Sequence, residues 1–133
     1  MESSPDYAPT LNRPKFCDHA IRPDETRGQK FDENKSRHDL VPPDAYGLIV
    51  DVFTYGARKY APRNWEKGIG YGRLFSAILR HLWAFWRGEE KDEDSGLPHL
   101  AHAGCTIMML LAHTQRQELL RFDERPSRRG EDV

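Results

Sequence analysis

The feature that most constrains the fold is the stretch of residues 80–113, where two apolar segments flank a short acidic loop, EEKDED at residues 89–94. Histidines stand where leucine would satisfy the apolar pattern: His81 in the first segment, His99 and His102 at the start of the second. His99 and His102 are one helical turn apart and share a face. We therefore expect a buried helical pair with carboxylates and imidazoles gathered at the turn between them, a combination that suits a divalent metal.

Apolar spacing along the rest of the chain predicts an all-α fold. A first helix over residues 43–60 ends before Pro62, which cannot continue it. A second, over residues 73–87, is apolar nearly all round, which predicts burial in the centre of the fold or at a subunit interface, and Gly88 is placed to cap its end. A third covers residues 97–120. No segment alternates with period two for long enough to indicate a sheet, so we expect a helical bundle of about three or four main helices.

The length of 133 residues predicts one domain. We expect an irregular N-terminal arm over residues 1–29, the helical domain over residues 30–121 and a polar tail over residues 122–133. The formal net charge of −1 supplies no global field that would favour nucleic acid or a membrane surface. The N-terminus has no basic-then-apolar leader and no apolar run reaches transmembrane length, so a cytoplasmic protein is expected, with Cys105 reduced and buried.

The acidic loop offers two carboxylates, Glu89 and Asp92, that could bind a hard cation through oxygen. Ordinary explanations exist for each part of the pattern. A lone histidine such as His81 on an apolar helix is more often a hydrogen-bonded core residue, and an acidic run is more often a solvated turn. Because both helix ends meet at this turn, the co-location favours a site. His113, about two turns further along, is predicted to be structural.

Residues elsewhere in the chain could bind a phosphate and a base. Arg80 lies inside the apolar second helix and is expected to need a partner there, either a carboxylate or a bound phosphate. Asn64 could hydrogen-bond a base edge, and Trp65 or Tyr60 could stack on the base. A surface loop with one anchoring tryptophan explains the same residues equally well.

Three stretches carry a resemblance: KFDENKSRHDLVPPDA at residues 30–45, FTYGARKYAPRNWEKG at residues 53–68 and RHLWAFWRGEEKDEDSGLPHLAHAGC at residues 80–105. Together they resemble the phage dATP/dGTP diphosphohydrolases of MazZ type, which are related to the all-α MazG-like nucleotide pyrophosphohydrolases. The resemblance implies a hydrolase that cuts dGTP, GTP or dATP between the α and β phosphates and needs Mg²⁺ or Mn²⁺, two or more ions per site. It also implies that the dGMP formed feeds synthesis of 2-aminoadenine nucleotide, in the host cytoplasm.

MazG-like enzymes carry E-x-x-E on one helix and E-x-x-D on the next, all directed at the metals. This sequence has no such pair before Glu89, and it has His99-x-x-His102 in the corresponding place. From the resemblance, the predicted metal ligands are Glu89, Asp92, Asp94 and His81. Either Glu89 or His99 is predicted to accept the proton of the attacking water. The predicted substrate-binding residues are Lys30, Asn34, Arg37, Lys59, Asn64, Trp65, Lys67, Arg80 and His102.

Two other functions remain open. His38-Asp39 could be the adjacent pair of an HD-type phosphohydrolase, with His81 and Asp51 as further ligands, and such an enzyme would release nucleoside and triphosphate. HD enzymes place that pair within a helix, whereas here it precedes two prolines. The other alternative is a non-catalytic phage binding module with structural histidines. A homodimer or homotetramer is expected, because the second and third helices are too apolar for one small subunit to cover.

Overall fold

The computed structural model describes residues 26–128. The chain divides into two units, residues 1–36 and residues 37–133, and each is considered by itself. In the first unit, the described residues 26–36 form exposed turns and irregular backbone. The predicted arm up to residue 25 and the predicted tail from residue 129 lie outside the described residues.

The second unit is built from three α-helices, α1 (Pro43–Lys59), α2 (Tyr71–Trp86) and α3 (His99–Gln115). Short 3-10 turns accompany them: η1 (His38–Leu40), η2 (Asn64–Lys67), η3 (Gln117–Phe122) and η4 (Pro126–Arg128). Residues 26–128 contain no strand, only an isolated antiparallel bridge between Lys91 and Pro98. The predicted all-α fold is therefore confirmed. Within this same part of the chain, no helix is long and apolar enough to cross a bilayer.

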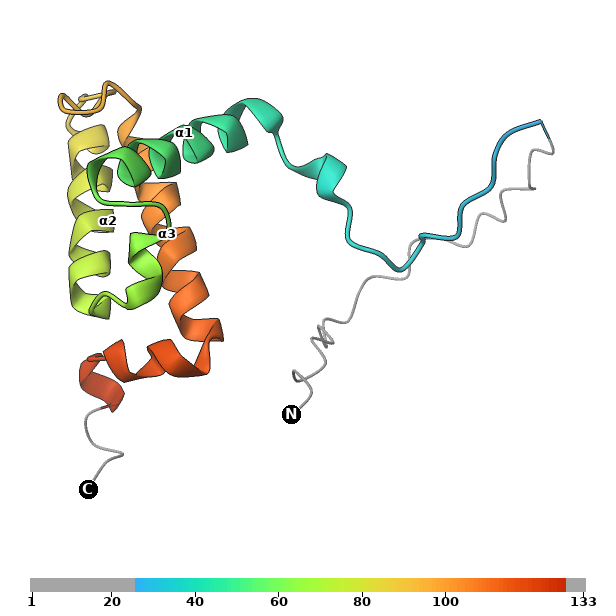
Figure 1. Ribbon diagram of the computed structural model, residues 1–133. Coiled ribbons are helices and arrows are strands. Elements are labelled where there is room, and N and C mark those ends of the chain that lie inside the picture. The colour runs from blue at the N-terminus through green and yellow to red at the C-terminus, as the bar shows by residue number, and fades with distance from the viewer. Residues whose placement is uncertain (1–25, 129–133) are drawn as a thin grey trace. The chain divides into compact units, whose positions relative to one another are not determined.

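The helices pack as an antiparallel pair with a third helix across it. α2 and α3 lie side by side, and α1 crosses α3 (Figure 1). Val52 of α1 packs with Ala101 and Cys105 of α3 in a small apolar core. Gly104 permits the close crossing, because a Cβ at this position would lie 2.9 Å from the Ile49 side chain. The crossing brings the second half of α1 beside the α2–α3 pair, where it forms one wall of a cleft.

The third helix is shorter than predicted. It ends at Gln115, and Arg116 takes an extended conformation before η3 begins, so the predicted continuation to residue 120 is wrong. The break turns the chain back onto the bundle, where Leu119 is buried and the Phe122 ring lies 6.4 Å from the ring of His113. Tertiary packing of these two apolar side chains outweighs the local preference for a longer helix.

The second helix is only partly covered within this chain. One face is buried through Leu74, Ile78 and Ala84, whereas Trp83 and Trp86 are 58% and 78% exposed. The predicted burial in the centre of the fold is therefore wrong, and the alternative, a subunit interface, stays a prediction. Arg80 is also exposed, so the expectation of a buried arginine that needs a partner is wrong. Its position on the less apolar side of α2 lets the guanidinium reach solvent.

Candidate functional site

An open cleft of about 1270 Å³ lies between α1, the loop that carries η2, α2 and α3. Its lining is rich in positive charge. Within residues 26–128, the basic side chains that line it are Lys59, Arg63, Lys67, Arg73 and Arg80, and the acidic ones are Asp92 and Asp94. A triphosphate is a compact polyanion, and a concave basic surface of this kind attracts such a ligand.

The acidic loop is aimed at this cleft by the way α2 ends. Gly88 has a φ of 96°, a conformation that costs glycine little. Its N–H donates to Phe85 O at 2.9 Å, and the N–H of Glu89 donates to Ala84 O at 3.0 Å. These two bonds form a Schellman motif, which confirms the predicted role of Gly88 in ending the helix. The loop then closes on itself, because the N–H of Asp92 donates to Leu97 O at 2.9 Å.

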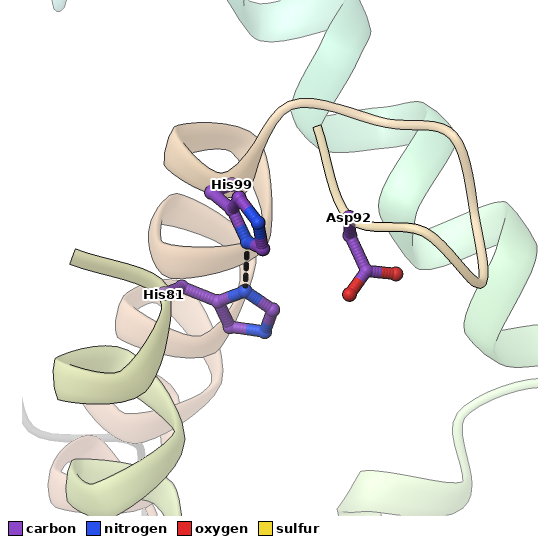
Figure 2. A group of neighbouring side chains, drawn as sticks. All are labelled: His81, Asp92 and His99. Atoms are coloured by element: carbon purple, nitrogen blue, oxygen red, sulfur yellow. Dashed lines mark hydrogen bonds between the residues drawn. The ribbon is translucent and has the colours of Figure 1, made fainter. Parts of the chain in front are cut away.

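Three side chains form a group that could hold a metal ion, and two of them, His81 and Asp92, also line the cleft. His81 of α2, Asp92 of the loop and His99 of α3 offer ligand atoms that all lie within 4.8 Å of one another (Figure 2). Nδ1 of His81 and Nδ1 of His99 are 2.9 Å apart and share a hydrogen bond, so one ring donates and the other accepts. His99 is buried and His81 is partly buried, which keeps the group largely away from solvent.

A hydrogen-bonded chain runs from His102 to Asp92 beside this group. Nε2 of His102 lies 2.6 Å from Ser95 Oγ, and this hydroxyl lies 3.0 Å from Asp92 Oδ2. The backbone N–H of Ser95 also donates to Asp92 Oδ2, at 3.0 Å. The His102 ring stacks on His81, with centroids 4.6 Å apart and an interplanar angle of 12°. The carboxylate and one imidazole of the group are thus both held in a defined orientation.

Electrostatics keeps these groups in the forms that bind metals. Burial lowers the pKa of His81 and of His102 below the usual histidine value, so both rings are neutral at pH 7. Burial alone would raise the pKa of Asp92, but the hydrogen bonds from Ser95 together with the neighbouring His102 and His81 outweigh it, and the pKa is lowered overall. Neutral imidazoles and an ionised carboxylate are the species that ligate a metal.

The structure brings together only part of the predicted metal and catalytic set. The group contains two predicted metal ligands, His81 and Asp92, and one predicted proton acceptor, His99. Glu89 lies outside the group: its side chain is 58% exposed, with Oε2 3.7 Å from His99 Nε2. Asp94 is exposed and lines the cleft without joining the group.

Most of the predicted substrate-binding residues lie along the cleft. Those that line it are Lys59, Asn64, Trp65, Lys67, Arg80 and His102. Arg37 does not line it: its guanidinium donates two hydrogen bonds to Asp39, at 2.8 and 2.6 Å. Lys30 and Asn34 belong to the first unit of the chain.

Trp65 is held by its neighbours, as an anchoring tryptophan would be. The guanidinium of Arg116 lies over its ring at 4.9 Å, and the His113 ring is 6.0 Å away. Tyr60, by contrast, is 66% exposed while it also lines the cleft. Its hydroxyl, next to Lys59, raises the pKa of that ammonium group, so the charge of Lys59 is retained at neutral pH.

Two residues that the structure places at the cleft or beside the metal group, Arg73 and Ser95, were not singled out from the sequence. Arg73 lines the cleft two helical turns before Arg80. The seven-residue spacing places both arginines on one face of an apolar helix, so the sequence could have predicted this pair. Ser95 follows Asp92 by three residues, a spacing typical of a side chain that bonds back to a nearby backbone. That it also bonds to His102 has no signal in the sequence.

Comparisons with known proteins agree with the resemblance of the motifs. The family described as dATP/dGTP diphosphohydrolase, N-terminal, matches residues 25–125. A protein of Salmonella phage PMBT28 named dATP/dGTP diphosphohydrolase is 32% identical over 83 residues, which cover 62% of this chain and 28% of that protein. The chain therefore corresponds to well under half of this relative. No solved structure matches. On the family match, which spans most of its length, the chain belongs to the dATP/dGTP diphosphohydrolase N-terminal family.

Proposed function

We propose that this chain is a metal-dependent nucleoside triphosphate pyrophosphohydrolase that converts dGTP, and also GTP or dATP, to the monophosphate and pyrophosphate. The observation that carries the proposal is the His81–Asp92–His99 group, of which His81 and Asp92 line the basic cleft. Such an arrangement supplies both a metal and cations for the phosphates. The name of the phage relative supports the choice of dATP and dGTP as substrates. In a phage, the dGMP formed would supply synthesis of 2-aminoadenine nucleotide.

The residues of the group fit a divalent cation, because two imidazoles and one carboxylate converge from three separate segments. When bound, a divalent cation polarises the phosphoryl oxygen and lowers the pKa of the attacking water. Glu89 is the proposed acceptor of a proton from that water, because its Oε2 lies 3.7 Å from Nε2 of His99 and its side chain is 58% exposed. The two other predicted ligands, Glu89 and Asp94, are proposed to hold a second ion. The family resemblance implies that this ion is Mg²⁺ or Mn²⁺.

The basic side chains of the cleft bind the phosphates in this proposal. Lys59 lies on α1, Lys67 on η2, and Arg73 and Arg80 on α2. They neutralise the charge that grows on the leaving pyrophosphate, which lowers the barrier for the chemical step. Asn64, at the start of η2, is proposed to hydrogen-bond the base.

We also propose that the protein works as a homodimer or homotetramer. Besides the two tryptophans, α2 exposes Phe75, Leu79 and Leu82, which recur along one side of the helix. An apolar stripe of this extent is typical of an interface rather than of a free surface.

The HD-type alternative receives little support from the geometry. His38 and Asp39 lie in the short turn η1, not within an α-helix, and both are exposed. The hydrogen bond from Arg37 lowers the pKa of Asp39 and occupies its carboxylate. Neither residue belongs to the group that could hold a metal.

Incubation of the full chain with dGTP and Mn²⁺, followed by separation of the products, tests the proposal. Pyrophosphate and dGMP are the expected products. Triphosphate and nucleoside would indicate the HD-type reaction. No turnover of any purine triphosphate would support the non-catalytic binding module. Asp92→Asn is expected to abolish turnover while helical content is retained. Glu89→Gln, which removes the proposed proton acceptor, is expected to do the same. His38→Ala is the matched control, because it removes an exposed imidazole that only the HD-type reaction needs.

A further inference from the structure

The donor atoms of the candidate metal group point to a particular class of metal. We infer that His81, Asp92 and His99 form a mixed nitrogen and oxygen site that selects a first-row transition ion, Mn²⁺, Co²⁺ or Zn²⁺, over Mg²⁺. The inference rests on the proposed function, and it names the cofactor class that the same site takes.

The chemistry of the three ligands favours a transition ion over Mg²⁺. Mg²⁺ prefers oxygen ligands and keeps much of its water, so it is bound by carboxylates and phosphates. Imidazole nitrogen suits later, softer divalent ions, whose affinity rises from Mn²⁺ through Co²⁺ towards Cu²⁺. Two of the three donors here are imidazoles, and the acidic side chains around them, Glu89 and Asp94, stand outside the group.

The spacing of the two nitrogens is close to that of two ligands of one ion. Nδ1 of His81 and Nδ1 of His99 are 2.9 Å apart. Two imidazole nitrogens that each lie about 2.1 Å from one ion are about 3.0 Å apart at a right angle and about 3.4 Å apart at the tetrahedral angle. A small rotation of the two rings would therefore direct both nitrogens at one ion, in place of the proton that they share.

Neighbouring side chains fix the orientation of two of the ligands, Asp92 and His81. Ser95 donates to Asp92 through its backbone N–H, and its hydroxyl joins Asp92 to His102. His102 also stacks against His81, which fixes the plane of that ring. Hydrogen-bonded support of this kind is what orients metal ligands in proteins. Ser95 and His102 are thus positioning residues, whereas the phosphate-binding cations lie elsewhere along the cleft.

Metal titration of the nucleotide-free protein tests the inference. The full chain, freed of metal with a chelator, is titrated separately with MgCl₂, MnCl₂, CoCl₂ and ZnCl₂, and the melting temperature and the visible absorption of Co²⁺ are recorded. We expect Mn²⁺, Co²⁺ and Zn²⁺ to raise the melting temperature at concentrations at least roughly tenfold below those needed for Mg²⁺. Bound Co²⁺ is expected to show the absorption of a nitrogen-ligated ion, at one ion per group.

Variants locate the site. His99→Ala and His81→Gln are expected to weaken Co²⁺ binding by roughly 100-fold and Ser95→Ala by roughly 10- to 100-fold, whereas His38→Ala leaves it unchanged. Circular dichroism checks that each variant is folded. If His99→Ala does not fold, His81→Gln provides the same test. The inference is overturned if Mg²⁺ acts at the same concentration as Mn²⁺ and Co²⁺, or if folded His99→Ala and His81→Gln keep the wild-type Co²⁺ spectrum and affinity.

These experiments distinguish a failure of the metal inference from a failure of the proposed hydrolase function. Selective Co²⁺ binding without hydrolysis of any nucleotide supports the metal inference and contradicts the proposed function. Release of pyrophosphate with Mg²⁺ bound as tightly as Co²⁺ supports the function and overturns the metal inference.

Discussion

Nε2 of His113 accepts a hydrogen bond from the backbone N–H of Ile69, at 3.1 Å, and this bond ties the cleft loop to α3. The other ring nitrogen, Nδ1, donates to Met109 O at 2.7 Å. The ring is fully buried, so both of its nitrogens depend on these partners. Because the loop carries Asn64 and Trp65, a structural histidine determines where one wall of the cleft stands.

His113→Ala is expected to lower the free energy of unfolding by about 3 kcal/mol, since it leaves a cavity and an unsatisfied N–H. The loop would also loosen, so the KM for nucleotide should rise more than kcat falls. Urea denaturation followed by circular dichroism measures the first effect. His38→Ala, which removes an exposed ring, should stay within about 0.5 kcal/mol of the wild type. An unchanged urea midpoint in His113→Ala would show that the loop does not depend on this histidine.

Gly68→Ala is expected to destabilise the protein by about 3 kcal/mol for two reasons that can be separated. Gly68 has a φ of 99°, which costs other residues about 1–2 kcal/mol. A Cβ there would also overlap the Phe122 ring, and such overpacking costs about 1–3 kcal/mol. In a Phe122→Ala background, the same change should cost only the backbone part.

Gly47→Ala is the matched control for this glycine. Gly47 lies within α1, and nothing lies within 4 Å of the Cβ that would be added. Alanine should therefore stabilise the helix by about 0.5–1 kcal/mol. Chemical denaturation of both variants decides the matter: a loss of stability at position 47 equal to that at position 68 would contradict the packing argument.

The sequence predicted the helices well because their causes are local. Apolar residues at helical spacing placed α1 and α2 within two residues at each end. The end of α3 was wrong because Leu119 and Phe122 fold back onto side chains that are distant in the sequence. No local signal reports such contacts.

The site shows the same division. The histidines were found because they interrupt an apolar pattern, which is visible in the sequence. The sequence did not predict that Asp92 joins the metal group while Glu89 stays outside it, because this depends on which way each loop side chain turns. Asp92 is turned inward by two hydrogen bonds from Ser95, while Glu89 stays largely in solvent. In an acidic run, composition alone cannot separate these two outcomes.

The stability of the metal-free protein is expected to fall as the pH drops through about 6.5, the usual pKa of histidine. Burial lowers the pKa of His81 and His102 in the folded state, so between their folded pKa and 6.5 the unfolded chain binds more protons. Their contribution to stability is complete above 6.5 and is lost below it. Melting temperatures between pH 8 and pH 5.5 measure the effect. His81→Gln should flatten this dependence; an equally steep one would assign it to other groups.

The Cys105 thiol is expected to be inert in the folded protein. It is buried between α1 and α3, and burial raises its pKa to about 12, so almost no thiolate exists at pH 8. In a Cys17→Ser background, which leaves one thiol, labelling by iodoacetamide should be slow in buffer and fast in urea. Rapid stoichiometric labelling without urea, at unchanged helical content, would mean that the α1–α3 contact opens readily.

Trp83→Glu and Trp86→Glu are expected to convert an oligomer into monomers. Both tryptophans belong to the exposed apolar stripe of α2, and a buried, unpaired carboxylate at an interface is strongly unfavourable. Light scattering coupled to size-exclusion chromatography gives the mass of each variant. Ser76→Glu is the matched control, because it adds the same charge to α2 at an exposed polar position beside Arg73 and Arg80. A wild-type protein that runs as a monomer at micromolar concentration, or tryptophan variants that keep the wild-type mass, would remove this stripe as the interface. If the masses change as expected while Co²⁺ binding does not, each subunit holds its metal group without help from its partner.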